Sequence, residues 1–68
     1  MTNKQKQHLL AYLGFYHGTV TGMWDKESKT AALRFQETYG IVADENCGDE
    51  SQKALISAVV YGMAAAPV

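Results

Sequence analysis

Apolar residues recur at helical spacing in three segments of the chain, and two polar, glycine-bearing stretches separate them. The first segment predicts a helix over residues 4–13, with Thr2 and Gln5 at the spacing of a capping box at its start. Gly14 follows, where a helix commonly ends in a left-handed residue. The predicted apolar stripe of this helix consists of Leu9, Leu10 and Leu13.

Two further helices follow along the chain. The second should begin after Asp25, whose carboxylate suits an N-cap, and should end at Gly40. The third should begin after Gly48 and end near Gly62. The residues expected to face the core are Ala31, Ala32, Phe35 and Tyr39 in the second helix and Ala54, Leu55, Ala58 and Val59 in the third. The pattern therefore predicts an all-α fold, a compact three-helix bundle.

The second and third helices open with related sequences. The segment 27–31 reads ESKTA, and the segment 50–54 reads ESQKA. Each follows a polar turn, so each copy is expected to form a loop followed by a helix. Such a unit cannot bury its apolar face alone. Two quasi-repeated loop–helix units, with the first helix in front of them, would make one compact domain.

The length of 68 residues suits one small domain. A chain of this size buries only roughly 60% of the surface that its unfolded form exposes, which leaves little room for an enclosed catalytic cavity. The hydrophobic content of 47% argues against disorder. We expect the domain to cover residues 1–62 and the Ala- and Pro-containing residues 63–68 to begin a linker.

The charge and the cysteine content of the chain argue against several classes of function. The net charge is −1 and the six Lys and Arg residues are scattered, so no basic face for nucleic acid is expected. A single cysteine, Cys47, excludes an internal disulfide and a multi-cysteine zinc site. No apolar run reaches the about 18 residues of a membrane-spanning helix. Residues 1–5 are polar, where a signal peptide needs an apolar stretch.

No catalytic or metal-binding motif emerges from the sequence. The acidic stretch 44–50 lacks the glycine and glutamate spacing of a calcium loop. His8 and His17 have no further ligands at the spacing of a zinc site. Ser28 and Ser51 stand at helix starts and lack a glycine-flanked nucleophile turn. No metal, no cofactor and no enzymatic activity are therefore expected.

One ordered set of residues is similar to a known family. It reads Leu10-x-x-Leu13-Gly14-Phe15-Tyr16-x-Gly18-x-Val20-x-Gly22, then Ala31-Ala32-x-x-Phe35-Gln36, then Tyr39-Gly40-Ile41, Asp44 and Gly48. Over residues 6–60 this set resembles the small three-helix peptidoglycan-binding domain of bacterial and phage cell-wall hydrolases. The chain departs from the family pattern at Thr21, Asp25, Glu45, Lys6 and Cys47. If the position of Glu45 requires a positive φ, the glutamate costs about 1 kcal/mol or more.

The resemblance implies a non-catalytic module that binds peptidoglycan and holds a covalently linked hydrolase (an endolysin, autolysin, amidase or murein peptidase) on its substrate. Tethering raises the effective concentration of the catalytic domain at the wall. We expect a monomer that acts at the bacterial cell wall, binds neither nucleic acid nor membrane, and is made in the cytoplasm and released on lysis, as from a phage or prophage lysin. The alternative is a protein–protein interaction or spacer module that uses Leu33, Ile56 and the third helix.

Peptidoglycan offers sugar faces, amide-rich stem peptides and carboxylates, which aromatic, amide and cationic side chains recognise. The candidate ligand-binding residues are Tyr16, His17, Trp24, Arg34, Gln36 and Tyr39. Tyr16 and His17 are expected to be exposed beside Gly18, with loop packing as an equal alternative. Burial beneath the second helix is the stronger interpretation for Trp24. For Gln36 the stronger interpretation is an anchor for the amides of a neighbouring loop, a role also expected for Gln7.

Overall fold

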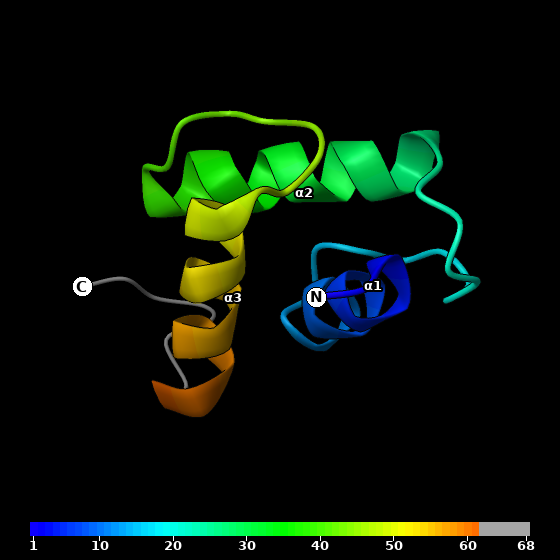
Figure 1. Cartoon of the computed structure of the whole chain (residues 1–68), viewed down its shortest axis with the longest axis horizontal. Helices are drawn as coiled ribbons and strands as arrows, with labels where there is room; N and C mark the ends of the chain where they lie inside the picture. The colour runs from blue at the N-terminus through cyan, green and yellow to red at the C-terminus, as the bar shows by residue number, and fades with distance from the viewer. Residues whose placement is uncertain (62–68) are drawn as a thin grey trace.

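The computed structural model describes residues 1–61. Within this range the chain forms three α-helices and no strand: α1 (Asn3–Tyr12), α2 (Lys26–Tyr39) and α3 (Asp49–Tyr61). Figure 1 looks almost along the axis of α1, while α2 runs across the view and α3 descends beneath one end of α2. The helices therefore pack crosswise, and the predicted all-α three-helix fold is confirmed.

Helix α1 begins with the predicted capping box. The amide of Gln5 donates to Oγ1 of Thr2 at 3.1 Å, and the amide of Thr2 donates to Oε1 of Gln5 at 2.8 Å. These bonds satisfy amides that the first turn of a helix leaves without partners. At the other end Gly14 has a φ of +92°, as the sequence predicted for the residue that closes the helix.

Helix α2 carries both predicted caps. Oδ1 of Asp25 accepts from the amide of Ser28 at 3.0 Å and from its hydroxyl at 2.9 Å. Gly40 ends the helix in the left-handed conformation, with a φ of 70°. Helix α3 begins at Asp49, directly after Gly48 as expected. The predicted helix end at residue 62 and the linker at 63–68 lie outside the described residues.

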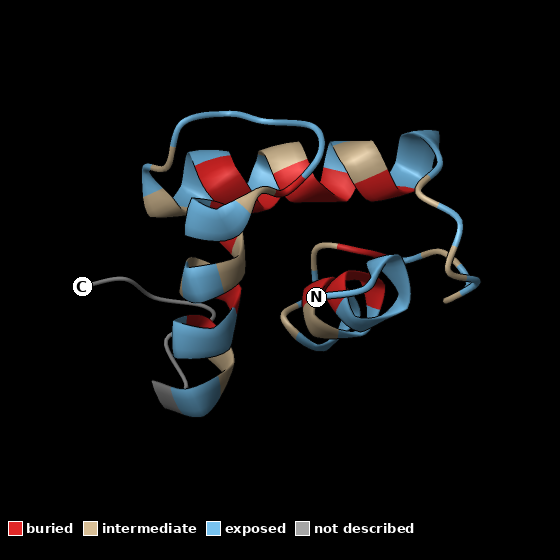
Figure 2. Ribbon diagram, viewed as in Figure 1, coloured by how far each residue is buried: buried red, intermediate tan, exposed pale blue. Residues whose placement is uncertain are grey.

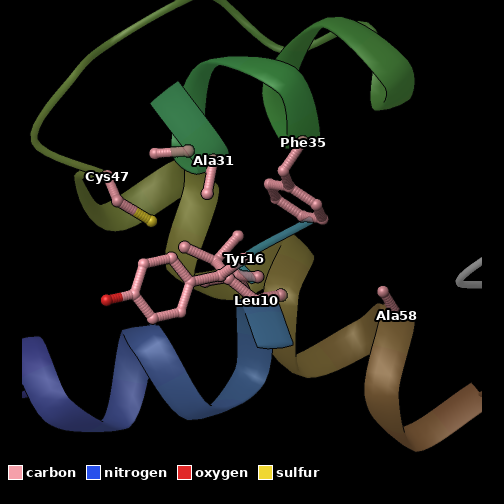
Figure 3. Packing of buried hydrophobic residues seen from close by; sticks show 8 residues of the cluster. Leu10, Tyr16, Ala31, Phe35, Cys47 and Ala58 are labelled. Carbon is pink, nitrogen blue, oxygen red and sulfur yellow. The ribbon is translucent and has the colours of Figure 1, made fainter. Parts of the chain in front are cut away.

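The core lies where the three helices and the two loops meet, on the inward faces shown in Figures 2 and 3. Its buried apolar residues are Leu10, Tyr16, Ala31, Ala32, Phe35, Cys47, Leu55 and Ala58. The ring of Phe35 packs edge-on against Phe15, with ring centres 5.6 Å apart. Ala31 and Ala32 have small side chains and so let neighbouring segments approach α2 closely. Val20 packs against this core, as predicted for the loop.

A buried glutamine on α1 fixes the first loop. Oε1 of Gln7 accepts from the amides of Thr21 and Gly22, at 3.1 and 2.8 Å. Its Nε2 donates to the carbonyl of Met23 at 2.7 Å and to the hydroxyl of Ser28 at 2.8 Å. The predicted role of Gln7 as a loop anchor is confirmed, and the loop is held in register with the start of α2.

Gln36 on α2 plays the same part for the second loop. Its Nε2 donates to the carbonyl of Asp44 at 2.8 Å and to the hydroxyl of Ser51 at 2.7 Å, and its Oε1 accepts from the amide of Asp44 at 2.7 Å. The sequence favoured this anchoring role for Gln36, and these bonds confirm it. Both loop–helix junctions are thus held by a glutamine from the preceding helix.

The strained backbone of the second loop lies at Cys47 and not at Glu45. Cys47 has a φ of 52°, and it is the one non-glycine residue with a positive φ in the described part of the chain. This conformation accompanies complete burial of the Cys47 side chain in the core. Lys6 is also nearly buried, and its Nζ donates to the carbonyl of Asn46 at 3.0 Å. None of the helices within residues 1–61 is long and apolar enough to cross a membrane.

Candidate functional site

A surface groove of about 460 Å³ lies between the first loop and the N-terminal half of α2. The loop contributes Phe15 and His17, and α2 with its cap contributes Asp25, Lys26, Glu27, Thr30, Ala31 and Arg34. We call this feature the loop–α2 groove. It combines concave shape, charges of both signs and one apolar ring.

Helical periodicity explains why α2 lines the groove. Glu27, Thr30, Ala31 and Arg34 are spaced three, four and seven residues apart, which places them on one face of a helix. Ala31 is only 2% exposed, whereas the longer side chains of its neighbours on this face reach solvent. The helix therefore supplies an apolar base between polar side chains.

The first loop is held by backbone bonds to the end of α1 and by a side-chain bond within the loop. The amides of Phe15 and Tyr16 both donate to the carbonyl of Leu10, at 2.9 and 3.2 Å. The hydroxyl of Tyr16 donates to the carbonyl of Thr19 at 2.7 Å. These bonds tie both sides of His17 to the folded core, so the loop presents this histidine to the groove from a fixed backbone.

Gly18 allows the loop to approach α2 closely. A Cβ atom at this position would lie 2.6 Å from Oε2 of Glu27 and 2.9 Å from the hydroxyl oxygen of Tyr16. Neither separation is compatible with ordinary van der Waals contact. The absence of a side chain at Gly18 thus sets how near the Glu27 carboxylate lies to the loop backbone.

The charges in the groove are not neutralised by direct pairing. Among residues 1–61 the side chains of His17, Lys26 and Arg34 form no ion pair. The hydrogen bonds that Ser28 donates through its amide and hydroxyl hold the pKa of the Asp25 carboxyl below its ordinary value, so this group is anionic at neutral pH. The cationic side chains of Lys26 and Arg34 are therefore available for a ligand carboxylate.

Two of the six predicted ligand residues, His17 and Arg34, line this groove together. Tyr16 does not, because its ring is only 4% exposed and belongs to the core. The expectation that Tyr16 is exposed on the loop is wrong: the chain turns inward after Gly14, as Figure 3 shows for the ring beside Leu10. Gln36 is fully buried by its anchoring bonds.

Trp24 and Tyr39 do not line the groove, although the ring centre of Tyr39 lies 6.4 Å from that of the groove residue Phe15. Trp24 is half-buried, donates through Nε1 to the carbonyl of Glu45 at 2.7 Å, and has Nζ of Lys6 5.2 Å from its ring centre. Tyr39 is half-buried and its ring centre lies 4.8 Å from that of Phe35. Desolvation raises the pKa of the Tyr39 hydroxyl. Both rings take part in packing between segments of the fold.

Sequence reasoning did not assign six of the eight groove residues to a binding site. Asp25 and Ala31 were predicted only as a helix cap and a core residue, and no role in binding was predicted for Phe15, Lys26, Glu27 and Thr30. A signal for two of them was present, because Glu27, Thr30 and Arg34 form a polar stripe at helical spacing directly after a glycine-bearing loop. Lys26 and Phe15 carried no such signal. Their contribution depends on how the loop folds back against α2.

The thiol of Cys47 is not a reactive site. Burial raises its pKa, which disfavours the nucleophilic thiolate. Across residues 1–61 no group of three or more His, Cys, Asp or Glu side chains could hold a metal ion.

Comparisons with known proteins agree with this architecture. A family model described as "Putative peptidoglycan binding domain" matches residues 4–55. The chain is also similar to the N-acetylmuramoyl-L-alanine amidase CwlM of Mycobacterium tuberculosis, with 39% identity over 49 residues. That match covers 72% of this chain but only 12% of the amidase. No solved structure matches the chain.

Proposed function

The chain belongs to the family of peptidoglycan-binding domains, and we propose that it binds murein through the loop–α2 groove and holds a linked hydrolase on the cell wall. It is a non-catalytic binding module. The choice of this surface rests on the groove itself, which is lined by both His17 and Arg34. Neither side chain pairs with a carboxylate of the described residues.

The chemistry of the groove fits a stem peptide. Arg34 carries a planar guanidinium, which can bind a carboxylate through two parallel hydrogen bonds. Thr30 and His17 add polar atoms near it, and Phe15 offers apolar contact. Murein stem peptides bring carboxylates, amides and small apolar side chains to such a surface.

A linked catalytic domain would explain the value of a small binding module. The similar amidase is much longer than this chain, which matches only 12% of it. Modest affinity suffices for such a module, because attachment to the wall raises the local concentration of the linked domain. We also propose that the module is monomeric and that its parent protein is a phage or prophage endolysin. The similar hydrogen-bonding of Gln7 and Gln36 supports two quasi-repeated loop–helix units.

Co-sedimentation with purified murein sacculi tests the proposal, with chitin as the control polymer. The domain should pellet with sacculi and stay in solution with chitin. Arg34→Ala should weaken pelleting, whereas Lys53→Ala, an exposed cation on α3 outside the groove, should not. Retention of the wild-type domain in the supernatant at high micromolar concentration would remove the binding proposal. Concentration-dependent self-association would then favour an interaction module that uses the exposed Ile56.

A further inference from the structure

Opposite charges lie at the two ends of the loop–α2 groove. Asp25, Lys26 and Glu27 stand at its N-terminal end and together carry one negative charge, while Arg34 stands further along α2. Glu27 and Arg34 are seven residues apart, which is about 10 Å along a helix axis. The groove thus offers an anionic end and a cationic end on one helix face.

The groove is poorly suited to stacking on a sugar ring. Phe15 is the one phenyl ring among its lining residues, and this ring is half-buried and packed edge-on against Phe35. Tyr16 is in the core, and the Trp24 ring is engaged by Lys6. A carbohydrate site normally presents an open aromatic face, since such a ring is the large amphipathic contact surface. The lining favours the peptide part of murein over its glycan strand.

An uncrosslinked stem peptide carries the complementary charges. Its dibasic residue has a free side-chain ammonium, and its last residue has a free carboxylate. Crosslinking transfers the acyl group of the penultimate residue of a donor stem to the side-chain amine of an acceptor stem. The new amide replaces the terminal peptide bond of the donor, whose last residue leaves with its carboxylate. The donor stem then keeps its ammonium but loses its terminal carboxylate, and the acceptor stem keeps its carboxylate but loses its ammonium. Only an uncrosslinked stem therefore has both charges.

We propose that the loop–α2 groove selects uncrosslinked stem peptides, with the ammonium at Glu27 and the terminal carboxylate at Arg34. This inference rests on the proposed binding of murein by the same groove. The distance of about 10 Å between the two positions corresponds to roughly three residues of extended chain. A module of this kind would concentrate its linked hydrolase on new or partly digested wall.

The test uses soluble murein fragments of defined structure. The ¹⁵N-labelled domain is titrated with a disaccharide–tetrapeptide monomer, with its crosslinked dimer and with the disaccharide alone, and affinity is taken from amide chemical shifts. The monomer should bind about three- to fivefold more tightly per stem than the dimer, since each stem of the dimer has lost one charge and with it one exposed ion pair with the groove. The disaccharide alone should produce no saturable shift.

Variants connect the selectivity to the two charges. Glu27→Gln and Arg34→Gln should each lower affinity for the monomer and abolish its advantage over the dimer. The matched neutralisations Glu37→Gln on α2 and Lys53→Gln on α3 lie outside the groove lining and should leave both affinities unchanged. All four sites are exposed, and dispersed amide spectra will confirm that the variants fold.

Two outcomes separate this inference from the proposed function. If the domain pellets with sacculi but binds monomer and dimer equally, or binds the disaccharide alone, the selectivity proposal is wrong and murein binding stands. If the domain neither pellets with sacculi nor responds to any fragment, both proposals fail.

Discussion

The side-chain amide of Gln36 donates a 2.7 Å hydrogen bond to the hydroxyl of Ser51, and both residues are buried. Gln7 and Ser28 form the equivalent 2.8 Å bond at the other loop–helix junction. In each pair the glutamine also holds loop backbone, so each loop is fixed by buried polar bonds as well as by apolar packing. The shape of the groove depends on such bonds, because Gln7 anchors the loop that forms one of its walls.

Gln36→Leu should destabilise the domain strongly. The substitution keeps the side chain's approximate size but leaves the Ser51 hydroxyl and the backbone of Asp44 without their buried partner. Stranding a buried polar group costs about 1–3 kcal/mol. In a domain of this size each kcal/mol lowers the melting temperature by about 4–8 °C, which circular dichroism will measure.

A double variant distinguishes this mechanism from general damage to the core. Ser51→Ala removes the hydroxyl that Gln36→Leu leaves stranded, so the combined loss of stability should be smaller than the sum of the two single losses. Strictly additive losses would show that the two side chains do not act as a pair.

The caps of the helices could be predicted from sequence because their signals are local. Thr2 with Gln5, Asp25 and Gly40 each act on backbone within a few positions of themselves. The residue type alone therefore identifies them, and all of these predictions are confirmed. The anchoring role of Gln7 and Gln36 was also predictable, since each stands at a helix edge before a polar loop.

The positions of Tyr16 and Cys47 could not be predicted in the same way. The burial of Tyr16 follows from the turn after α1, and that of Cys47 follows from a positive φ that non-glycine residues seldom adopt. Both depend on the approach of distant segments. The groove was predicted in part for the same reason: His17 and Arg34 have suitable chemistry in the sequence, but their neighbour Phe15 is identified only once the loop lies on α2.

Asp25→Asn should make the stability of the domain less dependent on pH in the acid range. Bonds from the Ser28 amide and hydroxyl lower the pKa of the Asp25 carboxyl in the folded state below its ordinary value. A group with a depressed folded pKa stabilises the fold above the unfolded pKa, and this contribution is lost as the pH falls through the folded value. Asparagine can still cap the helix but does not titrate.

The measurement is the melting temperature of both proteins between pH 2 and pH 7. The wild type should lose more stability than Asp25→Asn below about pH 4. Parallel curves over the whole range would show that the capping bonds do not favour the ionised carboxyl.

Cys47 should resist thiol reagents in the native protein. Its side chain is fully buried and burial raises its pKa, so few folded molecules present a thiolate. With a global stability of about 3 kcal/mol, reaction through unfolding would be about 100-fold slower than in denaturant. Labelling with a chromogenic disulfide at pH 8, with and without guanidinium, gives this ratio. Similar rates in both solutions would mean that the second loop opens without global unfolding.

Ionisation of the Cys47 thiol should lower the stability of the domain at alkaline pH. A group whose pKa is raised on folding contributes fully below its unfolded pKa, here near 9.0, and its contribution is lost as the pH rises through the folded value. Cys47→Ala should therefore show a smaller decrease in melting temperature between pH 8 and pH 10.5 than the wild type. Equal decreases would assign the alkaline loss to other groups.

Gly18→Ala should impair binding of murein more than it impairs folding. The added methyl group would lie 2.6 Å from Oε2 of Glu27 and 2.9 Å from the Tyr16 hydroxyl. The Glu27 side chain is exposed and can swing away, but Tyr16 is buried and bonded to Thr19. Overpacking of this kind costs about 1–3 kcal/mol, and the displaced carboxylate would change the anionic end of the groove.

Gly48→Ala provides the matched control, because its methyl group would also crowd a carboxylate, at 3.0 Å from Oδ2 of Asp44, but on the second loop. Both variants should lose some thermal stability. Only Gly18→Ala should show weaker pelleting with sacculi, since Gly48 does not line the loop–α2 groove. Equal loss of pelleting would mean that binding follows stability alone, whereas a loss confined to Gly48→Ala would move the binding surface to the second loop.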